Sequence, residues 1–131
     1  MSKSVFRLRP PRAPRLNEND VEAQVLQMLR YRQYRPERLQ VGLYKTLDGR
    51  YQEGHPTGTP DYVCTHELYP AFYLEVKRPG GKASPEQVRK HIELRLNRLA
   101  VIVIDGIDPL LKWLAQHEGN ARKLWQKALE K

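Results

Sequence analysis

Three charged side chains lie where two neighbouring strands of this sequence are expected to meet. Asp61 follows a loop rich in glycine and proline and opens one strand, and Glu75 and Lys77 share one face of the next strand. If these strands pair, two carboxylates and an ammonium group converge, and a shared proton or a shared cation relieves the repulsion between such carboxylates. Oxygen ligands alone select a hard ion such as Mg²⁺ or Mn²⁺. A metal-bound water beside a lysine is suited to hydrolysis of a phosphodiester.

Each of these residues also has a purely structural interpretation. Glu75 and Lys77 could form a solvated ion pair on an open sheet face, and Asp61 could cap its loop through an Asx-turn. The string Glu-x-Lys arises by chance about once in every two chains of this length, so alone it carries little weight. Its setting is more informative, because a Pro-Asp pair precedes it by fourteen positions and a capped helix follows it.

The segments that position these residues are expected to be two strands and a helix. Strands are expected at 62–65 and 72–77, the second with Glu75 and Lys77 on the face opposite its apolar residues. After the break RPGGKASP, Ser84 caps a helix, and Gln87 completes an S-x-x-Q capping box.

Three further helices are expected. The first is capped by Asn19 or Asp20 and carries Glu22 at the edge of its buried stripe. The two others follow Asp108-Pro109 and are separated by Gly119. The apolar residues expected to be buried along the four helices are Val21, Val25, Met28 and Leu29; Val88, Ile92, Leu96 and Leu99; Leu110, Leu111 and Leu114; and Leu124, Trp125, Ala128 and Leu129.

The remaining strands indicate a mixed sheet. Segment 39–43 alternates as a strand does, and Asp48-Gly49 is typical of a hairpin turn. The run AVIVID at 100–105 has the pattern of a central strand that is covered on both faces. The order of elements indicates an α/β fold with helices on both sides of a mixed sheet.

Length and composition exclude several classes of protein. The chain has 131 residues, of which 40% are hydrophobic, enough for one domain with a single core. One cysteine, Cys64, excludes a disulfide framework and is expected to be a buried reduced thiol. The longest apolar run is far shorter than the roughly 20 residues of a membrane span, and the N-terminus does not resemble a secretory signal. We therefore expect a soluble, cytoplasmic protein with no membrane partner.

Two other chemistries find little support in the sequence. Cys64 and His66, with His55 nearby, have neither the spacing nor the number of ligands of a closed zinc site. The triplet Gly80-Gly81-Lys82 lacks the spacing and the helix junction of a phosphate-binding loop. The isolated His91 and His117 receive no role.

Most of the net charge of +8 lies in the first sixteen residues. This arm carries five basic residues, three prolines and no acidic residue, whereas the remaining chain carries a net +3. It could be a disordered solubility tail or a flexible arm that lies along a phosphate backbone. We therefore divide the chain into a basic arm, 1–16, and a domain, 17–131. The residues expected to bind nucleic acid are Arg7, Arg9, Arg12, Arg15, Arg78 and Lys82.

The stretches GTPDYV and YLEVKRPGGKASPEQ resemble the PD-(D/E)xK nuclease superfamily and, within it, the VRR-NUC family. The family pattern is a helix with a glutamate, a Gly-x-Pro-Asp loop, a strand ending Glu-Val-Lys and a helix that opens near a glutamine. The resemblance covers about residues 18–116. It implies a restriction-endonuclease-like fold, in which a mixed central sheet is flanked by helices. A C-terminal helix around Trp125 would be an addition to this pattern.

The resemblance also implies a metal site. Asp61 and Glu75 would bind Mg²⁺ or Mn²⁺, and the backbone carbonyl of Val76 would add a third oxygen. Glu22 would support the metal or its water shell, although it could equally be a first-turn residue that favours the helix dipole.

For the two remaining matched residues the resemblance implies catalytic roles. Lys77 would hold or activate the attacking water. Gln87 would orient this network or the DNA backbone, although the capping box alone explains its presence.

The activity implied is that of a metal-dependent DNA endonuclease, selective for branched DNA in the manner of a Holliday-junction resolvase. Resolution of a four-way junction requires two symmetric cuts, and a homodimer would supply two sites in matching orientation. The short length of the chain suggests a nucleoid-associated nuclease of phage or mobile-element origin. Two alternatives remain open: a non-catalytic nucleic-acid-binding module with the same fold, and a nuclease that acts on RNA or on duplex DNA.

Overall fold

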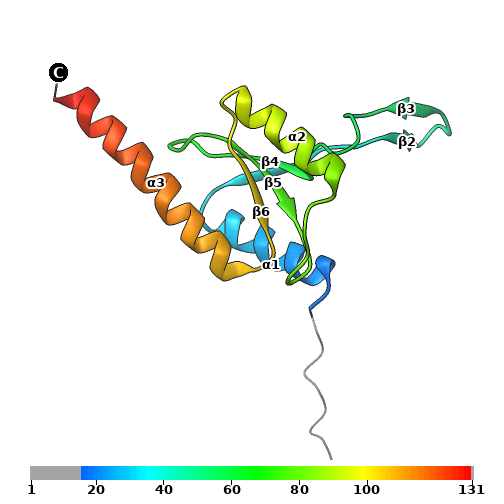
Figure 1. Ribbon diagram of the computed structural model, residues 1–131, viewed down its shortest axis with the longest axis horizontal. Helices are drawn as coiled ribbons and strands as arrows, with labels where there is room; N and C mark the ends of the chain where they lie inside the picture. The colour runs from blue at the N-terminus through cyan, green and yellow to red at the C-terminus, as the bar shows by residue number, and fades with distance from the viewer. Residues whose placement is uncertain (1–15, 131) are drawn as a thin grey trace, which may run out of the picture.

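A four-stranded mixed sheet lies at the centre of the protein (Figure 1), whose computed structural model describes residues 16–130. The strands are ordered β1-β4-β5-β6. The pairs β1/β4 and β4/β5 are antiparallel and β5/β6 is parallel. A separate hairpin, formed by β2 and β3, projects from one end of the molecule. The strands are β1 (Arg35–Arg38), β2 (Leu43–Lys45), β3 (Tyr51–Glu53), β4 (Tyr62–Thr65), β5 (Phe72–Val76) and β6 (Val101–Ile104).

Three helices flank this sheet, which confirms the predicted mixed α/β class. α1 (Glu18–Tyr31) and the first half of α3 (Ile107–Leu129) lie on one side of the sheet, and α2 (Pro85–Leu96) lies on the other (Figure 1). Apolar residues of α1, α3 and one face of the sheet form a single core. Its buried members include Val21, Val25, Leu29, Tyr34, Cys64, Phe72, Leu74, Val76, Ile102, Ile104, Leu110 and Leu114.

The elements around the candidate site form as the sequence predicts. β4 covers 62–65, and the alternation of β5 places its apolar residues in the core. α2 begins with the predicted capping box: the Gln87 amide nitrogen donates to Ser84 Oγ (3.2 Å), and the Ser84 amide donates to Gln87 Oε1 (2.9 Å). The hairpin turn at Asp48-Gly49 is also confirmed by the pairing of β2 with β3.

The predicted start of α1 lies two or three residues too late. Asn17, and neither Asn19 nor Asp20, is the N-cap. The Asn17 side chain accepts a hydrogen bond from the Asp20 amide, and the Asp20 carboxylate accepts one from the Asn17 amide, each at 2.9 Å. Asp20 therefore serves the cap from the third helical position, where a capping-box carboxylate belongs.

The two edges of the sheet also differ from the prediction. β6 is an edge strand, and Val103 is partly exposed, so the apolar run at 100–105 does not mark a central strand. The opposite edge is β1, and the strand predicted at 39–43 is wrong, because only Leu43 of that segment lies in a strand, β2. β1 contains Pro36, whose missing N–H is tolerated because the outer side of an edge strand has no partner.

α3 continues through Gly119 and does not divide there into two helices. A glycine inside a helix costs about 1 kcal/mol, and the buried row Leu110, Leu114, Glu118 and Ala121 runs across it. Arg32 Nη2 donates hydrogen bonds to both carboxylate oxygens of Glu118, at 3.0 and 3.1 Å, and these bonds join this part of α3 to the end of α1. Tertiary contacts on both sides of the glycine therefore hold the helix together.

The last turns of α3 extend beyond the sheet (Figure 1), and the prediction that their apolar residues face inward is wrong. Leu124 and Leu129 are 65% and 85% exposed. Trp125 stacks on Tyr69 with a centroid separation of 5.7 Å but remains partly exposed. The end of α3 thus presents an apolar face to solvent.

Gly58 is required where the loop before β4 passes the start of α2. Its φ is +92°, and a Cβ built on it would lie 2.7 Å from the carbonyl oxygen of Glu86. We expect Gly58→Ala to lower the free energy of unfolding by about 2 kcal/mol or more, because backbone strain and a clash with backbone add. Gly42→Ala is the matched control, because Gly42 has a φ of +75° with open space around it. Equal decreases in urea stability of the two variants would contradict the close approach.

Candidate functional site

Asp61 and Glu75 face each other at the end of the β4–β5 pair. Tyr62 pairs with Leu74, and the same antiparallel register places Asp61 directly opposite Glu75. The Asp61 amide donates to Glu75 Oε2 at 3.1 Å, and the Val76 amide donates to Asp61 Oδ2 at 3.1 Å. Two carboxylates from different strands are thus fixed side by side through each other's backbone.

Lys77 and Gln87 both reach the second oxygen of Glu75. Lys77 Nζ lies 3.4 Å from Glu75 Oε1, and the Gln87 side-chain amide donates a hydrogen bond to the same oxygen. Gln87 therefore has two functions, since its Oε1 completes the helix cap while its Nε2 holds the glutamate. The sequence supports either the cap or a site role, and the structure shows that the two contacts coexist.

The electrostatics of the pair disfavour two free negative charges. Glu75 is 1% exposed. Its burial and the neighbouring Asp61 carboxylate raise the pKa of Glu75 to about 7, against the opposing effect of Lys77. Burial also raises the pKa of Asp61, and the charges of Glu18 and Glu22 add to that effect. A bound cation would relieve this repulsion, since it adds positive charge where burial has removed water.

Glu22 lies at the margin of this pair. It accepts a hydrogen bond from the Tyr62 hydroxyl, and Arg38 lies 3.7 Å from its carboxylate. Glu18, one turn earlier on α1, is a neighbour that the sequence analysis missed, although its i, i+4 spacing from Glu22 could have indicated it. Within residues 16–130, no three His, Cys, Asp or Glu side chains form a group that could hold a metal ion. Asp61 and Glu75 are the two carboxylates that lie directly opposite each other, and Glu22 contacts Tyr62 and Arg38 beside them.

The donor set of this pair suits a hard divalent cation. Both candidate ligands are carboxylates, and oxygen ligands of this kind are preferred by Mg²⁺ and Mn²⁺. The alternative zinc site is not assembled. Cys64 is buried, which raises its pKa to about 12, and both ring nitrogens of His66 contact backbone groups, the Leu68 amide and the Arg32 carbonyl.

α2 turns its polar side toward the sheet, contrary to the sequence prediction. Gln87 reaches Glu75, and His91, one turn later, is the one residue of the helix that is buried. The predicted buried side is instead open to solvent: Val88, Ile92 and Leu96 are 44%, 49% and 80% exposed. A buried glutamate needs polar partners, so the helix above Glu75 presents an amide and an imidazole in place of its apolar row.

The residues expected to contact nucleic acid are only partly described. Arg78 and Lys82 are exposed in the loop that follows Lys77. Arg7, Arg9, Arg12 and Arg15 lie outside the described residues. The described chain begins in a groove of about 650 Å³ lined by Leu16, Asn17, Arg78, Pro79 and Gly80. The basic arm therefore joins the domain beside the loop that carries Lys77.

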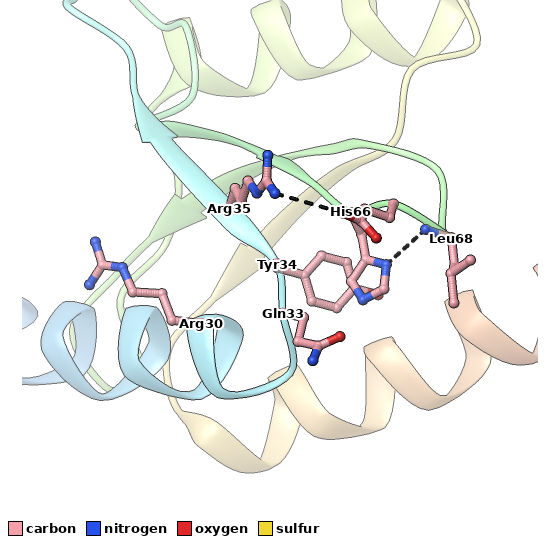
Figure 2. A pocket seen from close by; sticks show the side chains of 7 residues that line it. Arg30, Gln33, Tyr34, Arg35, His66 and Leu68 are labelled. Carbon is pink, nitrogen blue, oxygen red and sulfur yellow. Dashed lines mark hydrogen bonds and ion pairs between the residues drawn. The ribbon is translucent and has the colours of Figure 1, made fainter.

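A separate pocket of about 420 Å³ lies at the end of α1 and the start of β1 (Figure 2). Its lining includes Arg30, Gln33 and the ring of Tyr34, and none of the residues around Glu75. Its Arg35 pairs with Glu67 at 3.8 Å. The pocket thus lies apart from the carboxylate pair.

Comparisons with known proteins add no family assignment. The chain matches no protein-family model and no curated protein. Over residues 16–130, none of the helices has both the length and the apolar composition that crossing a bilayer demands.

Proposed function

We propose that the protein is a metal-dependent DNA endonuclease of the VRR-NUC type, with a restriction-endonuclease-like fold. One observation supports this function above all: Asp61 and Glu75 lie opposite each other, with Lys77 3.4 Å from Glu75 Oε1. The order of the matched motifs adds support, because the loop, the strand and the capped helix all contribute to this one place.

In this proposal each side chain has a defined part. Asp61, Glu75 and the Val76 carbonyl hold Mg²⁺ or Mn²⁺, and the ion supplies Lewis acidity and a more acidic water. Lys77 holds the attacking water and neutralises the charge that develops on the phosphate. Gln87 fixes the rotamer of Glu75 from the opposite side. Glu22, held by Tyr62, orients water around the site.

The test is a cleavage panel on labelled four-way junction, flap, linear duplex and single-stranded RNA, each with Mg²⁺, Mn²⁺ or EDTA. We expect metal-dependent cutting, fastest on the junction. Binding without cutting in either metal would instead indicate a non-catalytic nucleic-acid-binding module. Preferential cleavage of the duplex or the RNA would refute the selectivity for branched DNA and leave the chemistry intact.

Deletion of residues 1–15 is expected to weaken DNA binding on every substrate. The arm contributes five positive charges, and the described chain begins at Leu16 in the groove that Arg78 lines. The slope of log K against log salt should become shallower by roughly 0.9 for each phosphate that the arm neutralises in the full-length protein. A full-length control with the arginines of the arm changed to glutamine separates charge from chain length. An unchanged salt slope in both variants would make the arm an inert tail.

A homodimer is proposed as the active form, because two symmetric cuts in a junction require two sites in matching orientation. Trp113 packs against Phe72 in the core. The large apolar side chains that α3 exposes for a dimer contact are therefore Leu124, Trp125 and Leu129. We expect sedimentation to show a dimer at micromolar concentration, and the double variant Leu124→Glu with Leu129→Glu to sediment as a monomer. A monomeric wild type that still cuts junctions on both strands would contradict the dimer.

A further inference from the structure

His91 has an unusual position for a residue without an assigned role. It is 1% exposed, and its Nε2 is buried without a hydrogen-bond partner among the described residues. Buried polar atoms are nearly always paired, so each exception needs an explanation. A leucine would fill the same space without the free-energy cost of burying an unpaired nitrogen.

The surroundings of His91 point back to the candidate site. His91 follows Gln87 by one helical turn on the sheet-facing side of α2, so the two side chains occupy the same face. Gln87 and Lys77 converge on one oxygen, Glu75 Oε1. On the next turn Arg95 is already engaged, because it donates to the Val101 carbonyl at 2.8 Å.

The charge state of His91 allows it to accept a hydrogen bond. Burial, together with the nearby positive charges of Arg95 and Lys77, lowers the pKa of His91. The imidazole is therefore neutral near pH 7, and one of its nitrogens can accept a hydrogen bond. Arg95 already has a partner, which leaves the Lys77 ammonium as the donor without a dedicated acceptor once Glu75 binds a cation.

We propose that His91 is a positioning residue for Lys77. Its Nε2 accepts a hydrogen bond from the Lys77 ammonium, directly or through one water, when a divalent cation occupies Glu75. Lys77 then stays over the scissile phosphate instead of following the carboxylate or turning to solvent. This role deepens the nuclease function proposed above and depends on it.

Two substitutions separate positioning from packing. His91→Leu removes the acceptor and leaves no unpaired buried nitrogen, so we expect unchanged or higher thermal stability with kcat reduced about 10- to 100-fold at constant KM. His91→Gln keeps a neutral acceptor and should recover part of kcat. Glu93→Gln, on the exposed side of the same helix, is the control. A His91→Leu enzyme with wild-type kcat would overturn the proposal.

A measurement without turnover separates this inference from the function itself. We expect Ca²⁺ to shift the ¹⁵N resonance of His91 Nε2 in the wild type, and to leave it unshifted in Lys77→Met. If Ca²⁺ shifts the Val76 amide and leaves His91 unchanged, or shifts His91 equally in Lys77→Met, the role of His91 is wrong and the metal site stands. If Ca²⁺ shifts no resonance near Glu75, the nuclease proposal fails, and the role of His91 fails with it.

Discussion

Lys77→Ala is expected to abolish DNA cleavage while DNA binding remains. The ammonium group lies 3.4 Å from Glu75 Oε1, in a position to act on the transition state rather than on the DNA duplex. Removal of one stabilising group of this kind costs up to about 1000-fold in rate. We therefore expect a decrease near that limit in single-turnover cleavage with Mg²⁺, and a Kd for junction DNA in Ca²⁺ that changes less than about threefold.

Lys112→Ala provides the control for a simple loss of positive charge, because Lys112 is exposed on α3 and is not among the side chains that contact Glu75. It should cut at the wild-type rate. Residual cleavage by Lys77→Ala within tenfold of the wild type would show that this lysine is not part of the catalytic group. Parallel loss of binding and cleavage would place it in the DNA interface instead.

Glu75→Gln is expected to remove activity and to stabilise the metal-free protein above neutral pH. The pKa of Glu75 is raised from 4.5 to about 7, so the folded protein binds more protons than the unfolded chain between these values. Its contribution to stability is therefore greatest below pH 4.5 and is lost as the pH rises through about 7. The shift corresponds to roughly 3 kcal/mol, part of which a neutral glutamine should recover.

Urea denaturation from pH 5 to pH 8.5 in EDTA tests this effect. The wild type should lose stability as the pH rises, whereas Glu75→Gln should show a flatter profile and exceed the wild type at pH 8. Mg²⁺ should stabilise the wild type and not the variant, because a ligand that binds only the folded state adds to its stability. The exposed Glu93→Gln should follow the wild-type profile. A Glu75→Gln profile parallel to and below that of the wild type would contradict a strained carboxylate.

Local sequence signals predict the elements that carry Asp61 and Glu75, but they leave open whether the two strands pair. The Ser84-Gln87 capping box, the alternation of β5 and the Pro-Asp at the start of β4 each depend on neighbours in the chain, and each is found in the structure. Antiparallel pairing then brings Asp61 opposite Glu75. Local patterns cannot supply the engagement of Glu22 by Tyr62, because that contact joins residues forty positions apart.

The wrong predictions arise where tertiary contacts override a local pattern. Periodicity alone places Val88, Ile92 and Leu96 in the core, but the helix must pair the buried Glu75, and its polar row faces the sheet. For the same reason the sequence assigns His91 no role, since nothing in the neighbouring sequence shows that it is buried. Gly119 has the local signature of a helix end, although a buried row of side chains carries α3 across it.

Anomalous diffraction from crystals grown with Mn²⁺ tests the metal site most directly. The proposed site predicts a Mn²⁺ peak bounded by one oxygen each from Asp61 and Glu75 and by the Val76 carbonyl, and no such peak in Asp61→Asn. A Mn²⁺ ion bound elsewhere on the domain, with the two carboxylates still joined only through each other's backbone amides, would contradict it.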